Sequence, residues 1–291
     1  MTDSKIGWIG LGAMGGAMAK RVAGAGFPLI VHDLRAEAMA PFAASAASAR
    51  EVGEQADLVF VCLASEEASL AVAAEIFGAA SKPAIYVEHS TLTPRAMNRL
   101  ATMAEEAGDI FLDAPVSGSK VAREAGKLSV MVGGPEAAFE RIKPVLETVG
   151  SNIFHLGAVG TGSVAKISNN LIALTNVLSV MQGLLLGVHN GIPMERLRDA
   201  VMAGTASSPI VAHIANLYIS KSYRTTEAPE AVLKLVIKDL MIARELAADS
   251  GVRMDLGEHA MAVWQEAVDA GLGETEMFIM LDYLEQGAAK P

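Results

Sequence analysis

The sequence is short of several features that would point to particular protein classes. It holds one cysteine, Cys62, in 291 residues, so a framework of disulfide bonds is excluded. The formal net charge is −10 and the 23 Lys and Arg residues form no cluster, which argues against nucleic acid as a partner. A strand pattern begins at Lys5, which leaves no room for a signal peptide. We therefore expect a cytoplasmic protein.

Metal-site and membrane signals are also weak. The six histidines are dispersed without ligand-like spacing, so we predict no metal site. The long uncharged segment from Leu171 to Val188 carries polar residues such as Thr175 and Gln182. This favours a buried helix of a soluble protein over a membrane span. The chain is 52% hydrophobic with only 5% aromatic residues, a composition that suits small side chains packed tightly between helices and a sheet.

The chain opens with a strand, a glycine loop and a helix. Ile6–Ile9 is predicted as the strand and Met14–Ala25 as the helix. In such a loop the first glycine permits a tight turn, the second lets backbone approach a pyrophosphate, and the third lets helix and strand pack closely. The free N–H groups of the helix N-terminus would then bind phosphate. The predicted cofactor-binding residues here are Gly10, Leu11, Gly12, Ala13, Met14 and Gly15.

A second strand, Leu29–Asp33, ends where this fold places an acid that binds ribose. A carboxylate at Asp33 would accept hydrogen bonds from ribose hydroxyls and repel a 2′-phosphate, which favours NAD over NADP. NADP is not excluded, because Arg35 lies two residues further on and would partly offset the repulsion. The alternative is that Asp33 is the N-cap of a helix from Arg35 to Ala40.

Strand and helix patterns then alternate. Leu58–Leu63, Ile85–Glu88 and Ile110–Asp113 are predicted strands, separated by helices at Glu67–Phe77 and Pro94–Ala107. This alternation predicts an α/β fold with a parallel, doubly wound sheet of Rossmann type.

The carboxyl ends of these strands should line the cofactor crevice. We therefore predict that Leu63, Ala64 and Thr91 contact the cofactor. Thr91 is equally a candidate for the N-cap of the helix that begins near Pro94.

A Ser-Gly-Ser loop follows the strand that ends at Asp113. Its backbone N–H groups and hydroxyls suit a small carboxylate, so Ser117, Gly118 and Ser119 are predicted to bind substrate. The alternative is an ordinary surface loop. Leu128–Val132 and Ile153–Leu156 are predicted strands that extend the sheet, on either side of a helix at Pro135–Val149. They would complete a dinucleotide-binding domain at residues 1–161.

The stretch from Gly157 to Asn170 opens the second domain, residues 162–291, which should be all helical. Lys166 and Asn170 are four residues apart and share one face of its long first helix. We predict that Lys166 transfers a proton and that Asn170 orients the substrate. The alternative for Lys166 is a lysine whose stem packs on a core helix while its charge reaches water. Further helices are predicted at Met194–Met202, at Pro209–Ile219, at Ala231–Asp249 and in a last group around Trp264 that runs to about Gln286.

Several of these motifs together resemble the β-hydroxyacid dehydrogenase family, and its 3-hydroxyisobutyrate dehydrogenase and tartronate semialdehyde reductase branch in particular. The motifs are Gly10–Gly15, Asp113–Gly118, Gly126–Gly134, Gly157–Asn170 and Lys238–Leu240. They run in order across nearly the whole chain, whose length does not fit the larger 6-phosphogluconate dehydrogenase branch. The resemblance implies a Rossmann-type domain, a helical domain and a homo-oligomer, dimer or tetramer, joined through the helices.

The resemblance also implies roles for single residues. The family's catalytic lysine falls on Lys166 and its substrate-holding asparagine on Asn170. Its substrate-carboxylate loop falls on Ser117 and Gly118, while Thr91 and Lys238 match positions that contact the cofactor.

This chain departs from the family pattern around the substrate. Ser119 replaces a glycine, Ala231 replaces an aromatic residue, and Lys120, Arg123 and Lys234 add positive charge. One hypothesis is that the added charges bind a second anionic group on the substrate. The alternative is that they are solvated surface residues.

The predicted reaction is NAD-dependent oxidation of a small β-hydroxyacid to a semialdehyde or keto acid, or its reversal. A neutral Lys166 amine would take the hydroxyl proton, and we expect burial and the nicotinamide charge to lower its pKa. Two alternatives are an imine or aldehyde reductase on the same scaffold and a dinucleotide-binding module without catalysis. Lys166 argues against the imine reductase, because those enzymes usually have a different residue there and favour NADP. The presence of Lys166, Asn170 and Ser117 together argues against the binding module.

Overall fold

The computed structural model describes residues 4–81, 83–225 and 231–287. The chain divides into two compact units, Met1–Lys166 and Ile167–Pro291. The division falls inside a helix that begins at Thr161, close to the predicted domain boundary between residues 161 and 162.

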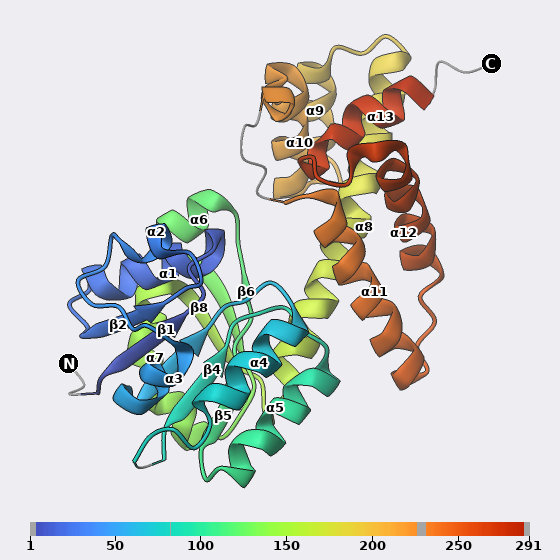
Figure 1. The fold of residues 1–291 in the computed structure, drawn as a ribbon. Coiled ribbons are helices and arrows are strands. Elements are labelled where there is room, and N and C mark those ends of the chain that lie inside the picture. Colours follow the sequence, from blue (N-terminus) through green and yellow to red (C-terminus); the bar gives the residue numbers. More distant parts are fainter. Residues whose placement is uncertain (1–3, 82, 226–230, 288–291) are drawn as a thin grey trace. The chain divides into compact units, whose positions relative to one another are not determined.

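The first unit is built on a five-stranded parallel sheet (Figure 1). Its order, β2-β1-β3-β4-β5, places the first strand between the second and third, as in a doubly wound fold. Every residue of β1, β3 and β4 is buried, which is expected of parallel strands covered on both faces. The predicted fold class is confirmed. The strands are β1 Ile6–Ile9, β2 Leu29–His32, β3 Leu58–Val61, β4 Ile85–Glu88 and β5 Ile110–Asp113.

Helices cover both faces of this sheet and enclose two hydrophobic cores. Side chains alternate along a strand, so Phe60 lies in one core while Val59 lies in the other. The sequence patterns missed the short helix α3, because its seven residues show little apolar periodicity. The helices are α1 Ala13–Gly24, α2 Ala36–Met39, α3 Ala49–Gln55, α4 Glu66–Ile76, α5 Pro94–Glu106 and α7 Glu136–Val149.

Three further strands form a separate sheet, which corrects our expectation that the strands predicted at Leu128–Val132 and Ile153–Leu156 extend the first one. The three strands are β6 Val116–Ser117, β7 Leu128–Val132 and β8 Gly150–His155, in the order β6-β7-β8. Strand β6 was not predicted. An isolated bridge between Asp113 and Gly133 joins the two sheets. The chain changes direction after β5, where Pro115 has no N–H to donate to a ladder. The short helix α6, Lys120–Glu124, follows β6.

The second unit is helical, as predicted. Its described part, residues 167–225 and 231–287, contains no strand. Trp264, Met181 and Leu240 are fully buried in its core. The helices are α8 Thr161–His189, which begins in the first unit, α9 Met194–Met202, α10 Pro209–Ser220, α11 Leu233–Ser250, α12 Asp255–Ala267 and α13 Met280–Gly287, with short turns at Ser222–Thr225, Val268–Leu272 and Met277–Ile279.

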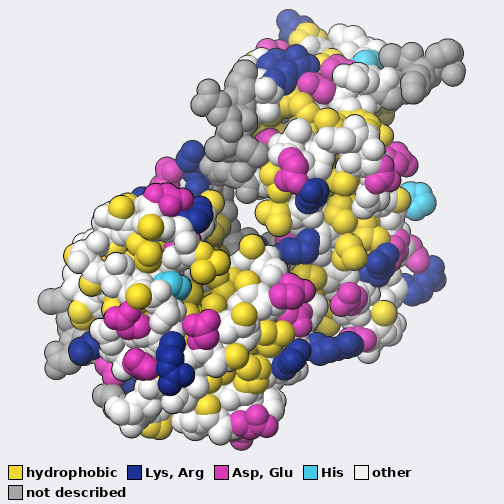
Figure 2. Space-filling view, viewed as in Figure 1, with side chains coloured by type: hydrophobic (Ala, Val, Ile, Leu, Met, Phe, Trp, Pro, Cys, Tyr) yellow, Lys and Arg dark blue, Asp and Glu magenta, His cyan; other side chains and the backbone are white. Residues whose placement is uncertain are grey.

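Helix α8 is the one described helix that is long and apolar enough to cross a membrane, by length and composition alone. The core helix of a soluble protein meets the same criterion. On the face shown in Figure 2, Lys and Arg side chains lie among Asp and Glu side chains rather than in one patch. The absence of a nucleic-acid partner stays a prediction.

Candidate functional site

The three glycines of the first loop have three different surroundings. Gly10 has a φ of +91°, and a Cβ atom there would lie 2.2 Å from the Cys62 carbonyl oxygen. A Cβ atom at Gly15 would lie 2.2 Å from the Gly10 carbonyl oxygen. By contrast, a Cβ atom at Gly12 would meet nothing within 4 Å. Gly10 and Gly15 are therefore needed by the fold, while Gly12 leaves open space beside the backbone.

That open space lies at the N-terminus of α1. Gly12 is the N-cap residue and provides no side-chain hydrogen bond, and the first turn holds no acidic residue. The orphan N–H groups and the positive end of the helix dipole thus remain available to an anion. This loop fits the pyrophosphate of a dinucleotide.

Asp33 follows β2 and is tied to the glycine loop. Its Oδ2 accepts a 2.7 Å hydrogen bond from the Leu11 N–H, and its Oδ1 accepts bonds of 2.9 and 3.0 Å from the backbone N–H and Nε of Arg35. Burial opposes ionisation, but the bonds from Arg35 and Leu11 outweigh it and hold the pKa of Asp33 below its usual value. The alternative role as a helix N-cap is wrong, because α2 begins at Ala36 with Arg35 in the N-cap position.

A buried carboxylate holds the loops after β3 and β4 together. Glu88 Oε1 accepts bonds from the backbone N–H of Ser90 at 2.9 Å and from its hydroxyl at 2.5 Å. The same hydroxyl accepts a 2.7 Å bond from the Leu63 N–H. Burial raises the pKa of Glu88 to about 7, against the effect of the Ser90 bonds. The predicted cofactor residues Leu63 and Ala64 therefore lie on a loop that Glu88 fixes through Ser90.

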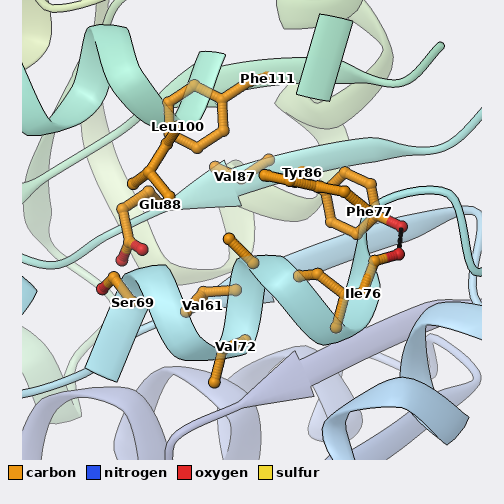
Figure 3. Close-up of a pocket in the computed structure, with 11 residues that line it drawn as sticks. Val61, Ser69, Val72, Ile76, Phe77, Tyr86, Val87, Glu88, Leu100 and Phe111 are labelled. Atoms are coloured by element: carbon orange, nitrogen blue, oxygen red, sulfur yellow. Dashed lines mark hydrogen bonds between the residues drawn. The ribbon is translucent and has the colours of Figure 1, made fainter. Parts of the chain in front are cut away.

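Glu88 also lines a small internal cavity between β3, β4, α4 and α5 (Figure 3). Apart from Ser69, Tyr86 and Glu88, its lining is apolar, and Tyr86 donates a 2.7 Å hydrogen bond to the Ile76 carbonyl. The free volume, about 10 Å³, is about that of a single water molecule. This cavity is too small for a substrate or cofactor.

Thr91 is half-buried and follows the Glu88–Ser90 turn. Its alternative role as a helix N-cap is wrong. Thr93 is the N-cap residue of α5, and its hydroxyl accepts a 3.0 Å bond from the Ala96 N–H. Thr91 follows the carboxyl end of β4, which lies next to the carboxyl end of β3, and β3 lies next to β1.

The Ser-Gly-Ser loop begins in β6, where Ser117 pairs with Ser129 of β7. Ser117 is half-buried and Gly118 is exposed. Ser119 is the N-cap residue of α6 and accepts a 3.3 Å bond from the Ala122 N–H, a role that sequence reasoning missed. The Ser119 hydroxyl is therefore partly engaged in holding the loop.

Helix α8 carries the two residues predicted to act on the substrate. Lys166 and Asn170 are both half-buried and lie one turn apart. The Asn170 amide nitrogen donates a 2.6 Å hydrogen bond to Asp239 Oδ2 on α11, and Lys238 Nζ lies 3.3 Å from Asp239 Oδ1. Because an ionised carboxylate only accepts, Asp239 fixes which way the Asn170 amide faces. Asp239 is adjacent to a predicted residue, but no role was predicted for it.

Comparisons with known proteins identify the family of the chain. Residues 5–157 match the NAD-binding domain of 6-phosphogluconate dehydrogenase, and residues 160–284 match the NAD-binding domain of NADP-dependent 3-hydroxyisobutyrate dehydrogenase. The chain is 35% identical to 2-hydroxy-3-oxopropionate reductase of Escherichia coli, with 84% of each chain covered. It is 31% identical to 2-(hydroxymethyl)glutarate dehydrogenase of Eubacterium barkeri, with 97% of this chain and 95% of that one covered.

The chain belongs to the β-hydroxyacid dehydrogenase family. A solved 3-hydroxyisobutyrate dehydrogenase of Mycobacterium tuberculosis, with L-serine, superposes with a TM-score of 0.88 at 26% identity, covering 97% of this chain and 99% of that one. The chain is thus an oxidoreductase of the 3-hydroxyisobutyrate dehydrogenase type that uses a nicotinamide dinucleotide. Imine reductases resemble it at 16–20% identity with TM-scores of 0.61–0.65, which shows a common fold and makes that alternative the weaker one.

The added positive charges of this dehydrogenase differ in their surroundings. Lys234 is exposed and forms an ion pair with Glu274 on the same unit, which favours the surface alternative for this residue. Lys120 and Arg123 lie on α6, directly after the Ser-Gly-Ser loop. Ala231 is half-buried and packs against the helical core. Among the described residues, no group of three His, Cys, Asp or Glu side chains suits a metal ion, and the absence of a metal stays a prediction.

Proposed function

We propose that this dehydrogenase oxidises a small β-hydroxyacid to the corresponding semialdehyde or keto acid, or catalyses the reverse reduction, with NAD as the preferred cofactor. The observation that carries the proposal is the pair Lys166 and Asn170, one turn apart on α8, with the Asn170 amide oriented by Asp239. The alternative role of Lys166, a lysine whose stem packs on the helix while its charge reaches water, would not require an oriented amide one turn away.

Each predicted residue has a part in this reaction. The nicotinamide supplies the hydride acceptor for the carbinol carbon. Lys166 takes the hydroxyl proton in the oxidation and returns it in the reduction. Asn170 holds the hydroxyl or carboxylate, and Ser117 with the Gly118 backbone holds the carboxylate. Lys238 contributes a contact to the cofactor.

The dinucleotide is held by the first unit. Gly10, Gly12 and Gly15 form the pyrophosphate loop, together with Leu11, Ala13 and Met14. Asp33 accepts hydrogen bonds from the adenosine ribose. Leu34, the residue after Asp33, is 97% exposed. Its apolar side chain provides a contact for the adenine ring. Leu63, Ala64 and Thr91 lie on the nicotinamide side.

The family relatives suggest the substrate class. Their names specify 2-(hydroxymethyl)glutarate, 2-hydroxy-3-oxopropionate, 3-hydroxyisobutyrate and L-serine. All are small carboxylates with an oxygen-bearing carbon β to the carboxyl group. We propose that Lys120 and Arg123, beside the carboxylate loop, decide whether a second anionic group is accepted.

The experiment that tests the function is NADH formation, measured by absorbance, with a panel of these hydroxyacids. Lys166→Ala should lower kcat by about 10²- to 10⁴-fold, the usual contribution of a general acid–base, while NADH binding is retained. Lys143→Ala, which removes an exposed lysine of α7, is the control. Equal loss of turnover and NADH binding in Lys166→Ala would mean that the lysine is structural. Turnover of cyclic imines instead of hydroxyacids would favour the imine reductase alternative.

We also propose a homo-oligomer, dimer or tetramer, in the cytoplasm. The helical unit exposes large apolar side chains, with Ile172 at 62% and Leu186 at 68% on α8 and Leu256 at 73% on α12. Exposed apolar surface of this kind is typical of a subunit interface. Cell fractionation tests the location.

A further inference from the structure

We propose that Asp113 is a positioning residue for catalysis, which caps the first turn of α8 with its buried carboxylate and so sets Lys166 relative to the substrate-carboxylate loop. The proposal rests on the proposed function, because the role of Lys166 is part of it. Asp113 is the last residue of β5 and is fully buried.

The carboxylate of Asp113 takes up the backbone donors at the start of α8. Oδ1 accepts a 2.6 Å hydrogen bond from the Gly160 N–H, and Oδ2 accepts a 2.7 Å bond from the Ser163 N–H. The Gly162 N–H also points to this carboxylate. These are the N–H groups that a helix leaves without an intrahelical partner. No residue beside Thr161 in the sequence has a carboxylate, so the cap comes from a strand 47 residues away.

Two glycines make room for this contact. A Cβ atom at Gly133 would lie 2.4 Å from Asp113 Oδ1. A Cβ atom at Gly162 would lie 2.9 Å from Oδ2 and 2.2 Å from the Met131 carbonyl oxygen. The backbone of Asp113 also exchanges hydrogen bonds of 3.0 and 2.8 Å with Gly133. The side chain is thus enclosed between β7 and the start of α8.

The charge of Asp113 is balanced by these N–H groups. Within the described ranges, no Lys, Arg or His side chain lies within salt-bridge distance of Asp113. Burial raises the pKa of Asp113 to about 6, and the N–H bonds from Gly160, Ser163 and Gly162 oppose the rise. The positive end of the α8 dipole favours the anion at this place. The group is therefore ionised at neutral pH and holds the helix as an anion.

Asp113 stands between the two parts of the site that act on the substrate. In one direction the chain continues through Ala114 and Pro115 to Ser117 and Gly118. In the other, Ser163 precedes Lys166 by three residues, just under one turn. Ser163 also donates a hydrogen bond from its hydroxyl to the Leu92 carbonyl, at 2.5 Å, beside Thr91. One carboxylate thus fixes both the carboxylate loop and the helix that carries the lysine.

The experiment compares Asp113→Asn with a matched control, Asp109→Asn. Asp109 precedes the other end of β5, is also buried, and accepts backbone N–H bonds of 2.8 and 2.9 Å from Gly78 and Ala84. Asparagine at either place presents an amide nitrogen to N–H donors, so both variants should lose thermal stability. Only Asp113 touches α8.

The full-length enzyme is assayed with 3-hydroxyisobutyrate, or with the panel member of highest turnover, at a temperature where both variants are folded. We expect kcat of Asp113→Asn to fall about 100-fold below that of Asp109→Asn, since a misplacement of about 1 Å has this effect on a reacting group. The NADH dissociation constants of the two variants should agree. Equal kcat values in the two variants would overturn the proposal.

Further variants separate the possible failures. If Asp113→Asn does not fold, Asp113→Glu replaces it, with Asp109→Glu as its control, because the longer side chain keeps the charge but displaces the carboxylate from the Gly160 and Ser163 N–H groups. A kcat below that of Asp109→Glu with unchanged NADH binding supports the proposal, and equal kcat values overturn it. If Lys166→Ala keeps its turnover, the proposed function itself is wrong. If Lys166→Ala is inactive but Asp113→Asn is as active as Asp109→Asn, only the positioning role is wrong.

Discussion

Glu88→Gln should make the first unit more stable at alkaline pH and remove most of the loss of stability between pH 4.5 and 7. Glu88 is 3% exposed, and burial raises its pKa from 4.5 to about 7. Gln keeps the shape and can still accept the two bonds from Ser90. Its amide nitrogen can also donate toward Ser69, whose hydroxyl lines the same cavity.

The direction in which stability changes with pH follows from proton binding. An acid whose pKa is higher in the folded state than in the unfolded state binds its proton more tightly when folded. Stability is therefore lost as pH rises from 4.5 through about 7, and the full penalty applies above that range. A pKa that rises from 4.5 to about 7 corresponds to roughly 3 kcal/mol between the folded states with the charged and the neutral side chain. For a unit of this size that is roughly 10 °C in Tm at most.

The assay is the melting temperature of both proteins by differential scanning fluorimetry from pH 5 to 8.5. The Tm of the variant should exceed that of the wild type by an amount that grows from pH 5 to about 7 and then stays constant, and the two Tm values should approach each other near pH 5. Asp113 remains in the variant and has the same direction of shift, so a smaller slope persists below pH 6. A difference in Tm that is the same at every pH would refute the reasoning, since it would show that Glu88 does not carry a buried charge.

Two other predictions concern the cofactor and the assembly. Asp33→Asn should lower kcat/KM with NAD by about 10- to 100-fold, the effect of losing 1.5–3 kcal/mol from a charged hydrogen bond. It should raise kcat/KM with NADP, because Arg35 loses its carboxylate partner; an unchanged NAD to NADP ratio would exclude Asp33 from ribose recognition. Light scattering should give the mass of a dimer or tetramer, and Leu186→Glu should reduce that mass if α8 forms the interface. A monomer at micromolar concentration would contradict the oligomer.

The parts of the fold that the sequence predicts are those with local signals. The loop Gly10–Gly15, the apolar runs of β1 and β3–β5, and the helix boundaries of α9 and α10 all depend on neighbours within one or two turns. The separate sheet β6-β7-β8 was not predictable in this way. A short apolar sequence indicates that a strand pairs with another strand, but it does not indicate which strand.

The contacts that organise the site are not local. Asn170 is 69 residues from Asp239, and Asp113 is 50 residues from Ser163. Sequence spacing predicted Lys166 and Asn170 because a helix brings them together. It gave no sign of the carboxylates that hold them, since an Asp at the end of a strand is as often a simple turn residue. Similarly, Thr91 and Thr93 are equivalent as N-cap candidates until the position of the first helical N–H is known.

Asp113 and Glu88 are buried carboxylates at the ends of neighbouring strands, and neither has a cation beside it among the described residues. Burial raises the pKa of both, so ionising either carboxylate at neutral pH lowers the stability of the fold relative to its protonated form. A structural role alone does not explain two such residues at one edge of the sheet. Each carboxylate fixes loops from different strands: Glu88 joins the Leu63 and Ser90 loops, and Asp113 joins the Ser117 loop to α8. Because ionised acceptors form stronger hydrogen bonds than neutral ones, they hold these loops more rigidly. We infer that the lost stability is offset by the fixed geometry that hydride and proton transfer require.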